Sequence, residues 1–176
     1  ETKYQALRLD LLYTKHDQKF LPITERGAKK IKEAAKKLKE KNIDIIYASD
    51  FFRTCQTAKI VSAETGARIV LHKKLRDLHM GVFHGRPAQE YRQFFISKFQ
   101  RFAKRPPKGE NWRDVKKRLK EAFRQIDKKH KGKTILIVTH GDPLWLMLGW
   151  FKGLTEKELL DTRGGLYPQT GQYFVI

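Results

Sequence analysis

Thr134-Ile135-Leu136-Ile137-Val138-Thr139-His140-Gly141 is the stretch that decides the fold. Its apolar core, residues 135–138, predicts a strand buried on both faces of a parallel sheet. The strand leads directly into Thr139 and His140, ahead of a glycine. In open α/β sheets, ligand sites lie at the carboxyl ends of the strands. We therefore predict that His140 belongs to a functional site; the alternative is a histidine that only completes the packing.

Outward from this stretch, strands alternate with helices along the whole chain. The predicted strands cover residues 3–8, 43–49, 68–71 and 134–138. Helices are predicted over residues 25–41, 50–65, 89–103 and 143–152. A further long helix contains residues 112–126, and a last short helix is capped by Thr155. This alternation favours a three-layer α/β/α fold with a mostly parallel central sheet. We expect the aromatic residues of 89–103 to pack in the core rather than to form a ligand platform.

Length and composition indicate one folded domain over residues 1–176. With 40% hydrophobic residues, a chain of 176 residues can bury a full core. Because the chain begins at Glu1 rather than at a methionine, we expect a trimmed chain or a domain cut from a longer one. The single cysteine, Cys55, cannot form an internal disulfide, which favours a reducing, cytoplasmic compartment. No apolar run reaches the roughly 20 residues of a membrane helix, so no membrane partner is expected.

Net charge is the most unusual bulk property of the chain. Thirty-eight Lys and Arg residues against nineteen Asp and Glu residues give +19 at pH 7. Such a charge creates a positive field that attracts phosphorylated substrates or polyanions, nucleic acid among them. The alternative is that these lysines only solvate the exposed faces of the predicted helices.

Three polar positions at predicted strand ends suit a bound anion. Arg8 ends the first predicted strand, Arg53 follows the second, and His140 follows the last. Guanidinium groups contact phosphate oxygens in a bidentate way and keep their charge, and a helix N-terminus adds oriented N–H donors. If they converge, these residues form a phosphate pocket. Taken singly, Arg8 also fits a surface charge and Arg53 an ordinary residue at the start of a helix.

Five segments, in order, make a resemblance specific. They are Pro22-Ile23-Thr24-Glu25-Arg26-Gly27, Ser49-Asp50-Phe51-Phe52-Arg53-Thr54-Cys55-Gln56-Thr57-Ala58, Leu75-Arg76-Asp77-Leu78-His79-Met80-Gly81-Val82-Phe83-His84-Gly85, Pro107-Lys108-Gly109-Glu110-Asn111 and Val138-Thr139-His140-Gly141. The second is similar to the S-D-x-x-R-x-x-Q-T-A segment, and the last to the V-T-H-G segment, of the histidine phosphatase superfamily. The chain thus resembles the phosphoglycerate-mutase-like branch of that family over nearly its whole length.

The resemblance implies roles for individual residues. Arg8 and Arg53 match the two arginines that bind the phosphoryl group, and His140 matches the second histidine of the family site. Asp77 falls where the family carries an acidic proton donor for the leaving oxygen, usually a glutamate. Glu110 either contacts substrate or caps the helix that begins at Asn111, and we favour the cap. The resemblance implies no cofactor and no metal.

The family's nucleophile is missing from the printed residues. In the R-H-G motif, the arginine precedes the histidine that becomes phosphorylated, whereas Arg8 precedes Leu9 and Asp10. Leucine cannot attack phosphorus. Thirteen residues, 9–21, separate Arg8 from Pro22, fewer than in the family, and the shortfall falls directly after Arg8. Two interpretations stay open, a true deletion and a segment that the printed residues omit; rescue by another histidine needs a new geometry.

The leading hypothesis is a cytoplasmic phosphoester hydrolase that acts through a phosphohistidine on an anionic, phosphorylated small molecule. The shortness of the chain favours a phosphatase over a full mutase. The alternative is a catalytically inactive domain on the same fold that binds phosphate, RNA or protein. Neither the substrate nor the oligomeric state follows from the fold class.

Overall fold

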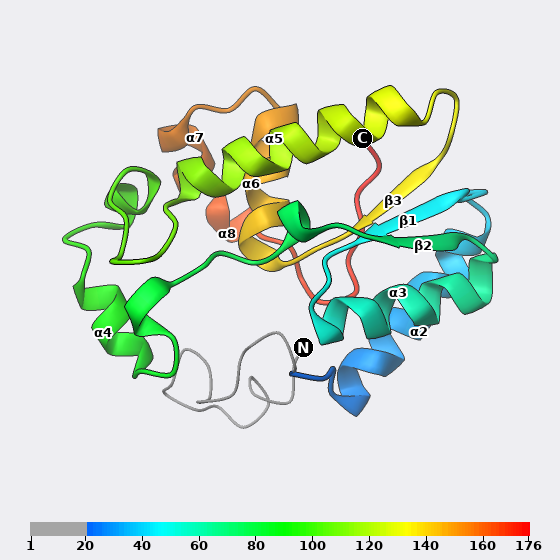
Figure 1. Ribbon diagram of the computed structural model, residues 1–176, viewed down its shortest axis with the longest axis horizontal. Coiled ribbons are helices and arrows are strands. Elements are labelled where there is room, and N and C mark those ends of the chain that lie inside the picture. The colour runs from blue at the N-terminus through cyan, green and yellow to red at the C-terminus, as the bar shows by residue number, and fades with distance from the viewer. Residues whose placement is uncertain (1–20) are drawn as a thin grey trace.

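The computed structural model describes residues 21–176 and contains, within that range, one sheet of three parallel strands. The central strand is β1 (Ile45–Ala48), which lies between β2 (Arg68–Leu71) and β3 (Ile135–Val138). These are the strands predicted at 43–49, 68–71 and 134–138, whereas the predicted strand 3–8 lies outside the described residues. Figure 1 shows the three strands side by side, with helices above and below them.

The other regular elements of the described chain are helices and short 3₁₀ turns, which loops connect. They are α2 (Glu25–Lys39), α3 (Phe52–Thr65), η2 (Lys73–Leu75), η3 (Gly81–Phe83), α4 (Ala88–Gln93), η4 (Lys98–Phe102), α5 (Trp112–Lys129), α6 (Gly141–Phe151), α7 (Glu156–Asp161) and α8 (Arg163–Leu166). Thr24 caps α2 through its side chain, as its residue type predicts. Gly66 ends α3 in the left-handed region, at φ 73°, which suits a glycine. No described helix is long and apolar enough to cross a membrane.

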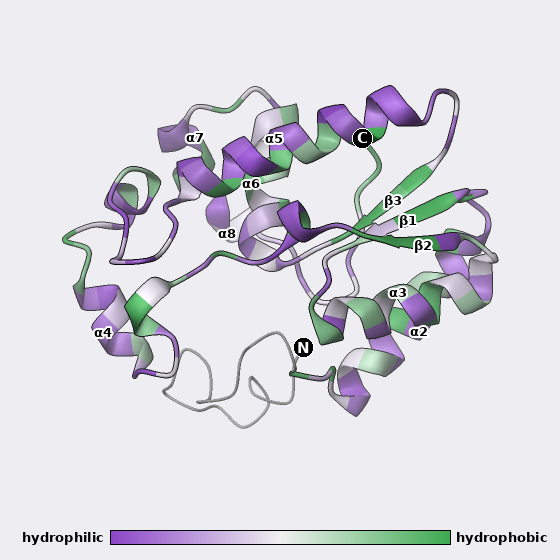
Figure 2. Cartoon of the chain, viewed as in Figure 1, coloured by the Kyte–Doolittle hydropathy of each residue, from purple (hydrophilic) through white to green (hydrophobic). Residues whose placement is uncertain are grey.

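Successive residues of β1 face two different cores. Ile45 and Tyr47 pack with residues of α5 and α6, while Ile46 and Ala48 pack with residues of α2 and α3. Side chains of a strand alternate between the faces of a sheet, so helices cover both faces. The predicted three-layer α/β/α fold with a parallel sheet is confirmed. Figure 2 shows the strands as the most hydrophobic part of the chain and the outer helices as mixed in character.

The predicted helix over 89–103 is wrong as a single element. Helix α4 ends at Gln93, Ser97 is extended at φ −141° and ψ 159°, and η4 resumes as a 3₁₀ turn. Phe95 and Phe102 both enter the core on either side of the break, and the ring of Phe102 packs against that of Trp112 with centroids 4.9 Å apart. The expectation that these aromatic residues pack in the core is confirmed for Tyr91, Phe95 and Phe102; Phe99, by contrast, is half exposed.

Candidate active site at the carboxyl ends of the strands

The candidate site lies where β1 and β3 end. Ser49 follows β1 directly and is fully buried, and His140, beyond the end of β3, is the residue before α6. Asp77 comes from the loop beyond β2 and η2. Parallel strands bring their carboxyl ends to one edge of the sheet, so residues 91 positions apart in the chain meet there.

His140 is the most deeply buried titratable group of this site. One ring nitrogen, Nε2, lies 2.9 Å from Ser49 Oγ, and Nδ1 lies 3.8 Å from an oxygen of Asp77. The edge of the Phe51 ring packs against the imidazole. Burial lowers the pKa of His140 well below its usual value, and the positive charges of Arg53 and Arg118 lower it further. The imidazole is therefore neutral near pH 7.

Asp77 and Arg53 form the charged part of the site. Arg53, in the first turn of α3, places Nη2 at 3.2 Å from Asp77 Oδ2, and both side chains are largely buried. The other carboxylate oxygen accepts a hydrogen bond from the backbone N–H of Leu78. Burial raises the pKa of Asp77, and this effect outweighs the opposing charge of Arg53. A raised pKa favours the protonated form of a carboxyl group, and that form can give a proton to a leaving oxygen.

Phe51 links the site to a second, more exposed arginine. The guanidinium of Arg53 lies 5.0 Å from the Phe51 ring centroid, and that of Arg76 lies 5.7 Å away. Arg76 also makes two hydrogen bonds of 2.6 Å to the carboxylate of Asp50. Both guanidinium groups thus lie near the ring of Phe51, and that of Arg53 also pairs with Asp77.

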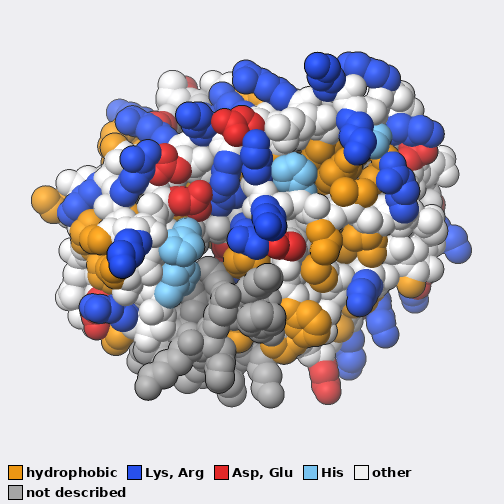
Figure 3. Space-filling view, in the orientation of Figure 1, with side chains coloured by type: hydrophobic (Ala, Val, Ile, Leu, Met, Phe, Trp, Pro, Cys, Tyr) orange, Lys and Arg blue, Asp and Glu red, His pale blue; other side chains and the backbone are white. Residues whose placement is uncertain are grey.

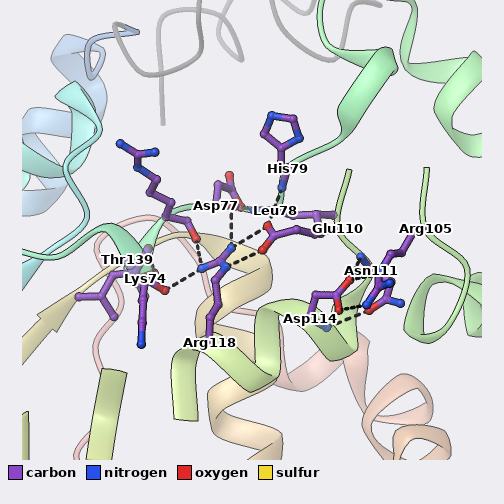
Figure 4. A network of polar contacts seen from close by, with 12 residues as sticks. Lys74, Asp77, Leu78, His79, Arg105, Glu110, Asn111, Asp114, Arg118 and Thr139 are labelled. Carbon is purple, nitrogen blue, oxygen red and sulfur yellow. Dashed lines mark hydrogen bonds and ion pairs between the residues drawn. The ribbon is translucent and has the colours of Figure 1, made fainter. Parts of the chain in front are cut away.

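Glu110 is not the cap of α5. Asn111 caps that helix and forms a reciprocal pair of hydrogen bonds with Asp114, so the cap interpretation of Glu110 is wrong. Glu110 instead accepts two hydrogen bonds from Arg118, at 2.8 and 3.0 Å, and one from the backbone N–H of His79. Figure 4 shows this pair beneath the loop that carries Asp77.

A second cluster centres on Asp142, two residues beyond His140. Its carboxylate accepts hydrogen bonds from Trp112 Nε1, Arg163 Nη2 and the Tyr167 hydroxyl at 2.9 to 3.0 Å, and from Arg101 Nη2 at 3.4 Å. Sequence reasoning missed Asp142 and Arg118. The available signals were an acid in the first turn after His140, and an arginine eight residues beyond Glu110 in the long helix that follows it.

The structure brings together Arg53, Asp77 and His140, while Glu110 supports the neighbouring loop. Arg8 lies outside the described residues. Within residues 21–176, no three His, Cys, Asp or Glu side chains gather so that they could hold a metal ion. The arrangement is a buried arginine, a neutral imidazole and a carboxyl group of raised pKa at one sheet edge. Such a set can bind a phosphate oxyanion and supply a proton.

Comparisons with known proteins give two kinds of match. A family model described as the histidine phosphatase superfamily (branch 1) matches residues 13–167. The probable phosphoglycerate mutase GpmB of Photorhabdus laumondii is 31% identical over 142 residues, which cover 76% of this chain and 64% of that protein. Phosphoserine phosphatase 1 of Hydrogenobacter thermophilus is 26% identical over 130 residues, 71% and 62% of the two chains. The chain thus spans less than two thirds of the length of these curated relatives.

Solved structures share the same fold. Bacillus stearothermophilus YhfR superimposes with a TM-score of 0.76 at 32% identity, over 90% of this chain and 79% of that one. The alpha-ribazole phosphatase from Shigella flexneri gives a TM-score of 0.73 at 20% identity, over 92% and 80% of the two chains. At that lower identity the likeness concerns the fold alone.

Proposed function

Because the chain belongs to the histidine phosphatase superfamily (branch 1), we propose that it hydrolyses phosphoesters of anionic small molecules through a phosphohistidine. The observation that carries the proposal is the convergence of Arg53, Asp77 and His140 at the carboxyl ends of the strands. Relatives named as a phosphoserine phosphatase and a probable phosphoglycerate mutase support the same reaction class.

Each residue of the site has a chemical role in this proposal. Arg53 and Arg8 hold the oxygens of the phosphoryl group, and neutral His140 donates a hydrogen bond to it while charge builds up. A histidine in the segment after Arg8 attacks phosphorus while the bond from phosphorus to the alcohol oxygen breaks, and protonated Asp77 gives its proton to that oxygen. A water molecule then attacks the phosphohistidine and gives its proton to the Asp77 carboxylate, which releases phosphate and restores both residues. The raised pKa of Asp77 and the lowered pKa of His140 suit these protonation states.

Leu9 decides between this reaction and simple binding. With a histidine in the segment after Arg8, the site transfers phosphate; with Leu9 in that place, it lacks a nucleophile and only binds anions. Peptide mapping of the purified natural protein across Arg8 by mass spectrometry identifies which segment is present. Inactive phosphate binding is therefore the second candidate function, and Leu9 is the observation that favours it.

Hydrolysis of p-nitrophenyl phosphate tests the proposed reaction. We expect turnover by the natural protein, a phosphorylated histidine after acid-free quenching, and a loss of about a thousandfold in His140→Ala. A folded protein that binds inorganic phosphate without any turnover would instead establish the inactive domain. Lys128→Ala, at the far end of α5, is the control and should retain full activity.

Nucleic-acid binding gains no support from the distribution of charge. Lysines are abundant on α2 and on α5, which cover opposite faces of the sheet. Figure 3 shows Lys and Arg spread over one face of the molecule, with acidic residues among them. Nucleic-acid binding surfaces gather positive charge on one side. Salt-dependent retention of RNA is the measurement that would restore this alternative.

A further inference from the structure

Arg118 divides its donors between the segment that carries Asp77 and the carboxylate of Glu110. From α5, its Nη1 donates to the backbone carbonyls of Lys74 and Arg76, at 2.7 and 2.8 Å, and its Nη2 donates to the carbonyl of Asp77 at 2.9 Å. Nε and Nη2 also donate to the two carboxylate oxygens of Glu110. Figure 4 shows the guanidinium at the centre of these contacts.

The loop needs such support because it has little regular structure. After η2, residues 76–80 form no helix and no strand, so their carbonyls have no ladder partners. Besides Arg118, the loop is held by Thr139, whose hydroxyl donates to the Leu75 carbonyl at 2.8 Å. On its other side, the loop is bonded to Glu110. The backbone N–H of His79 donates to Glu110 Oε2 at 3.0 Å, and the backbone N–H of Glu110 donates to the His79 carbonyl at 2.8 Å.

Only an arginine can make this set of contacts. A guanidinium presents five N–H donors in a rigid planar fork, whereas an ammonium is a flexible point charge with three. The side chain of Arg118 is 17% exposed and that of Glu110 is 25% exposed. Their ion pair is thus shielded, and it keeps the guanidinium plane fixed relative to the carbonyls.

We propose that Arg118, held by Glu110, is a positioning residue that sets the Asp77 carboxyl group against Arg53 and His140. This inference rests on the proposed function, because it assumes that Asp77 is the proton donor. Arg118 fixes the backbone of Asp77 itself, and Leu78 N–H and Arg53 then fix its two carboxylate oxygens. A shift of about 1 Å in a group that acts on the substrate can cost about a hundredfold in rate.

The test compares two leaving groups in Arg118→Lys. A p-nitrophenolate leaves without a proton, whereas the alkoxide of β-glycerophosphate needs one, so loss of Asp77 alignment should act selectively on the alkyl ester. We expect kcat for β-glycerophosphate to fall about tenfold or more with little change in KM, and kcat for p-nitrophenyl phosphate to fall much less. In an Asp77→Asn background the same substitution should add almost nothing.

Arg113→Met is the matched control. Arg113 lies in the same helix and makes a similar two-point ion pair, with Glu156, but is 57% exposed. It should leave both rates unchanged. Equal losses on the two esters in Arg118→Lys, or losses that add to those of Asp77→Asn, would show a merely structural role and overturn the proposal.

A measurement without turnover separates this inference from the proposed function. Carboxyl ¹³C NMR follows the titration of Asp77 in the wild type and in Arg118→Lys, which keeps a positive charge beside the loop. If Arg118 positions Asp77, this substitution moves the carboxyl group away from Arg53. Because the charge of Arg53 lowers the pKa of Asp77, that pKa should then rise, and the His140 ring signals should shift with it. An inactive wild type refutes the enzyme, whereas an unchanged Asp77 titration and unchanged His140 signals refute the positioning role.

Discussion

Asp77 and Asp142 both accept hydrogen bonds from arginine, but the two carboxylates have different surroundings. Asp77 meets Arg53 at 3.2 Å and one backbone N–H, beside the neutral ring of His140. Asp142 meets four side-chain donors from four segments of the chain: η4, α5, α8 and the residue that follows α8. Burial raises the pKa of Asp77, so this acid is poorly compensated in its ionised form.

These surroundings suit Asp77 to a role in the reaction and Asp142 to a role in holding the fold together. Around Asp142 the donors outnumber the acceptors, since Arg101 Nε, Arg163 Nη1 and Trp145 Nε1 are buried without a hydrogen-bond partner. Both arginines lie over the ring of Trp112, at 4.3 and 5.2 Å from its centroid. Asp142 therefore joins the parts of the fold, whereas Asp77, whose burial outweighs its contacts with Arg53 and the Leu78 N–H, is suited to exchange a proton.

Asp142→Ala should have the largest effect on stability. It leaves two largely buried arginines without their carboxylate, and loss of one partner of a buried pair costs about 3 kcal/mol or more. Urea unfolding measures the change in free energy. Asp127→Ala, which breaks an exposed ion pair on α5, should cost less than about 0.5 kcal/mol. A stable but inactive Asp142→Ala would erase the distinction between the two clusters.

Arg53→Met should produce the opposite pattern, a loss of activity larger than the loss of stability. It removes a buried donor to the phosphoryl group, an effect worth about a hundredfold in kcat, or about 2.7 kcal/mol. Asp77 can take up a proton when its cation is removed, which limits the effect on folding. Steady-state kinetics and thermal unfolding give the two readouts. Arg76→Met, beside the same Phe51 ring, is the control and should lose less than tenfold.

Local patterns were enough to predict the fold. Three short apolar runs became β1, β2 and β3, and Thr24 caps α2, because both features depend on residues close together in sequence. The five ordered motifs indicated the histidine phosphatase family, and the match over residues 13–167 confirms it. The same motifs selected Arg53, Asp77 and His140, which the structure brings together. Their catalytic roles stay predictions.

Contacts between distant residues were beyond local patterns. Asp142 meets Arg101 from 41 positions away and Arg163 from 21, so only the folded chain brings them together. Arg118 binds carbonyl groups, which every residue type has, so no sequence signal marks its targets. The helix predicted over 89–103 is interrupted between Gln93 and Lys98, and the helical spacing of its aromatic residues did not indicate this break.

The pH dependence of stability should distinguish the titrating cluster. The pKa of His140 is lowered in the folded state. As the pH falls through 6.5, the ordinary pKa of histidine, the unfolded chain therefore takes up a proton at this residue before the folded chain does. Because of His140, the free energy of unfolding should fall by about 1 kcal/mol as the pH drops from about 7.5 to 5.5, and His140→Gln should remove this fall.

Asp77→Asn should change the pH dependence of stability in the opposite sense. The raised pKa of Asp77 adds stability at low pH that is lost as pH rises, so its removal makes stability rise more steeply with pH. Parallel curves for wild type and His140→Gln would contradict the assigned burial.

Tyr167→Phe should have the smallest effect, confined to stability. Burial raises the pKa of Tyr167 well above its usual range, so the hydroxyl stays protonated and donates to Asp142 at 3.0 Å. Its loss leaves three donors on that carboxylate and should cost about 1 kcal/mol. Because the same ring packs against Gly141, next to His140, retention of the ring should keep kcat within about twofold. Tyr173→Phe is the control for loss of a hydroxyl, because Tyr173 is partly buried against the core on the other face of the sheet. If kcat falls in Tyr167→Phe but not in Tyr173→Phe, the Asp142 cluster affects the catalytic rate, through Gly141 and His140.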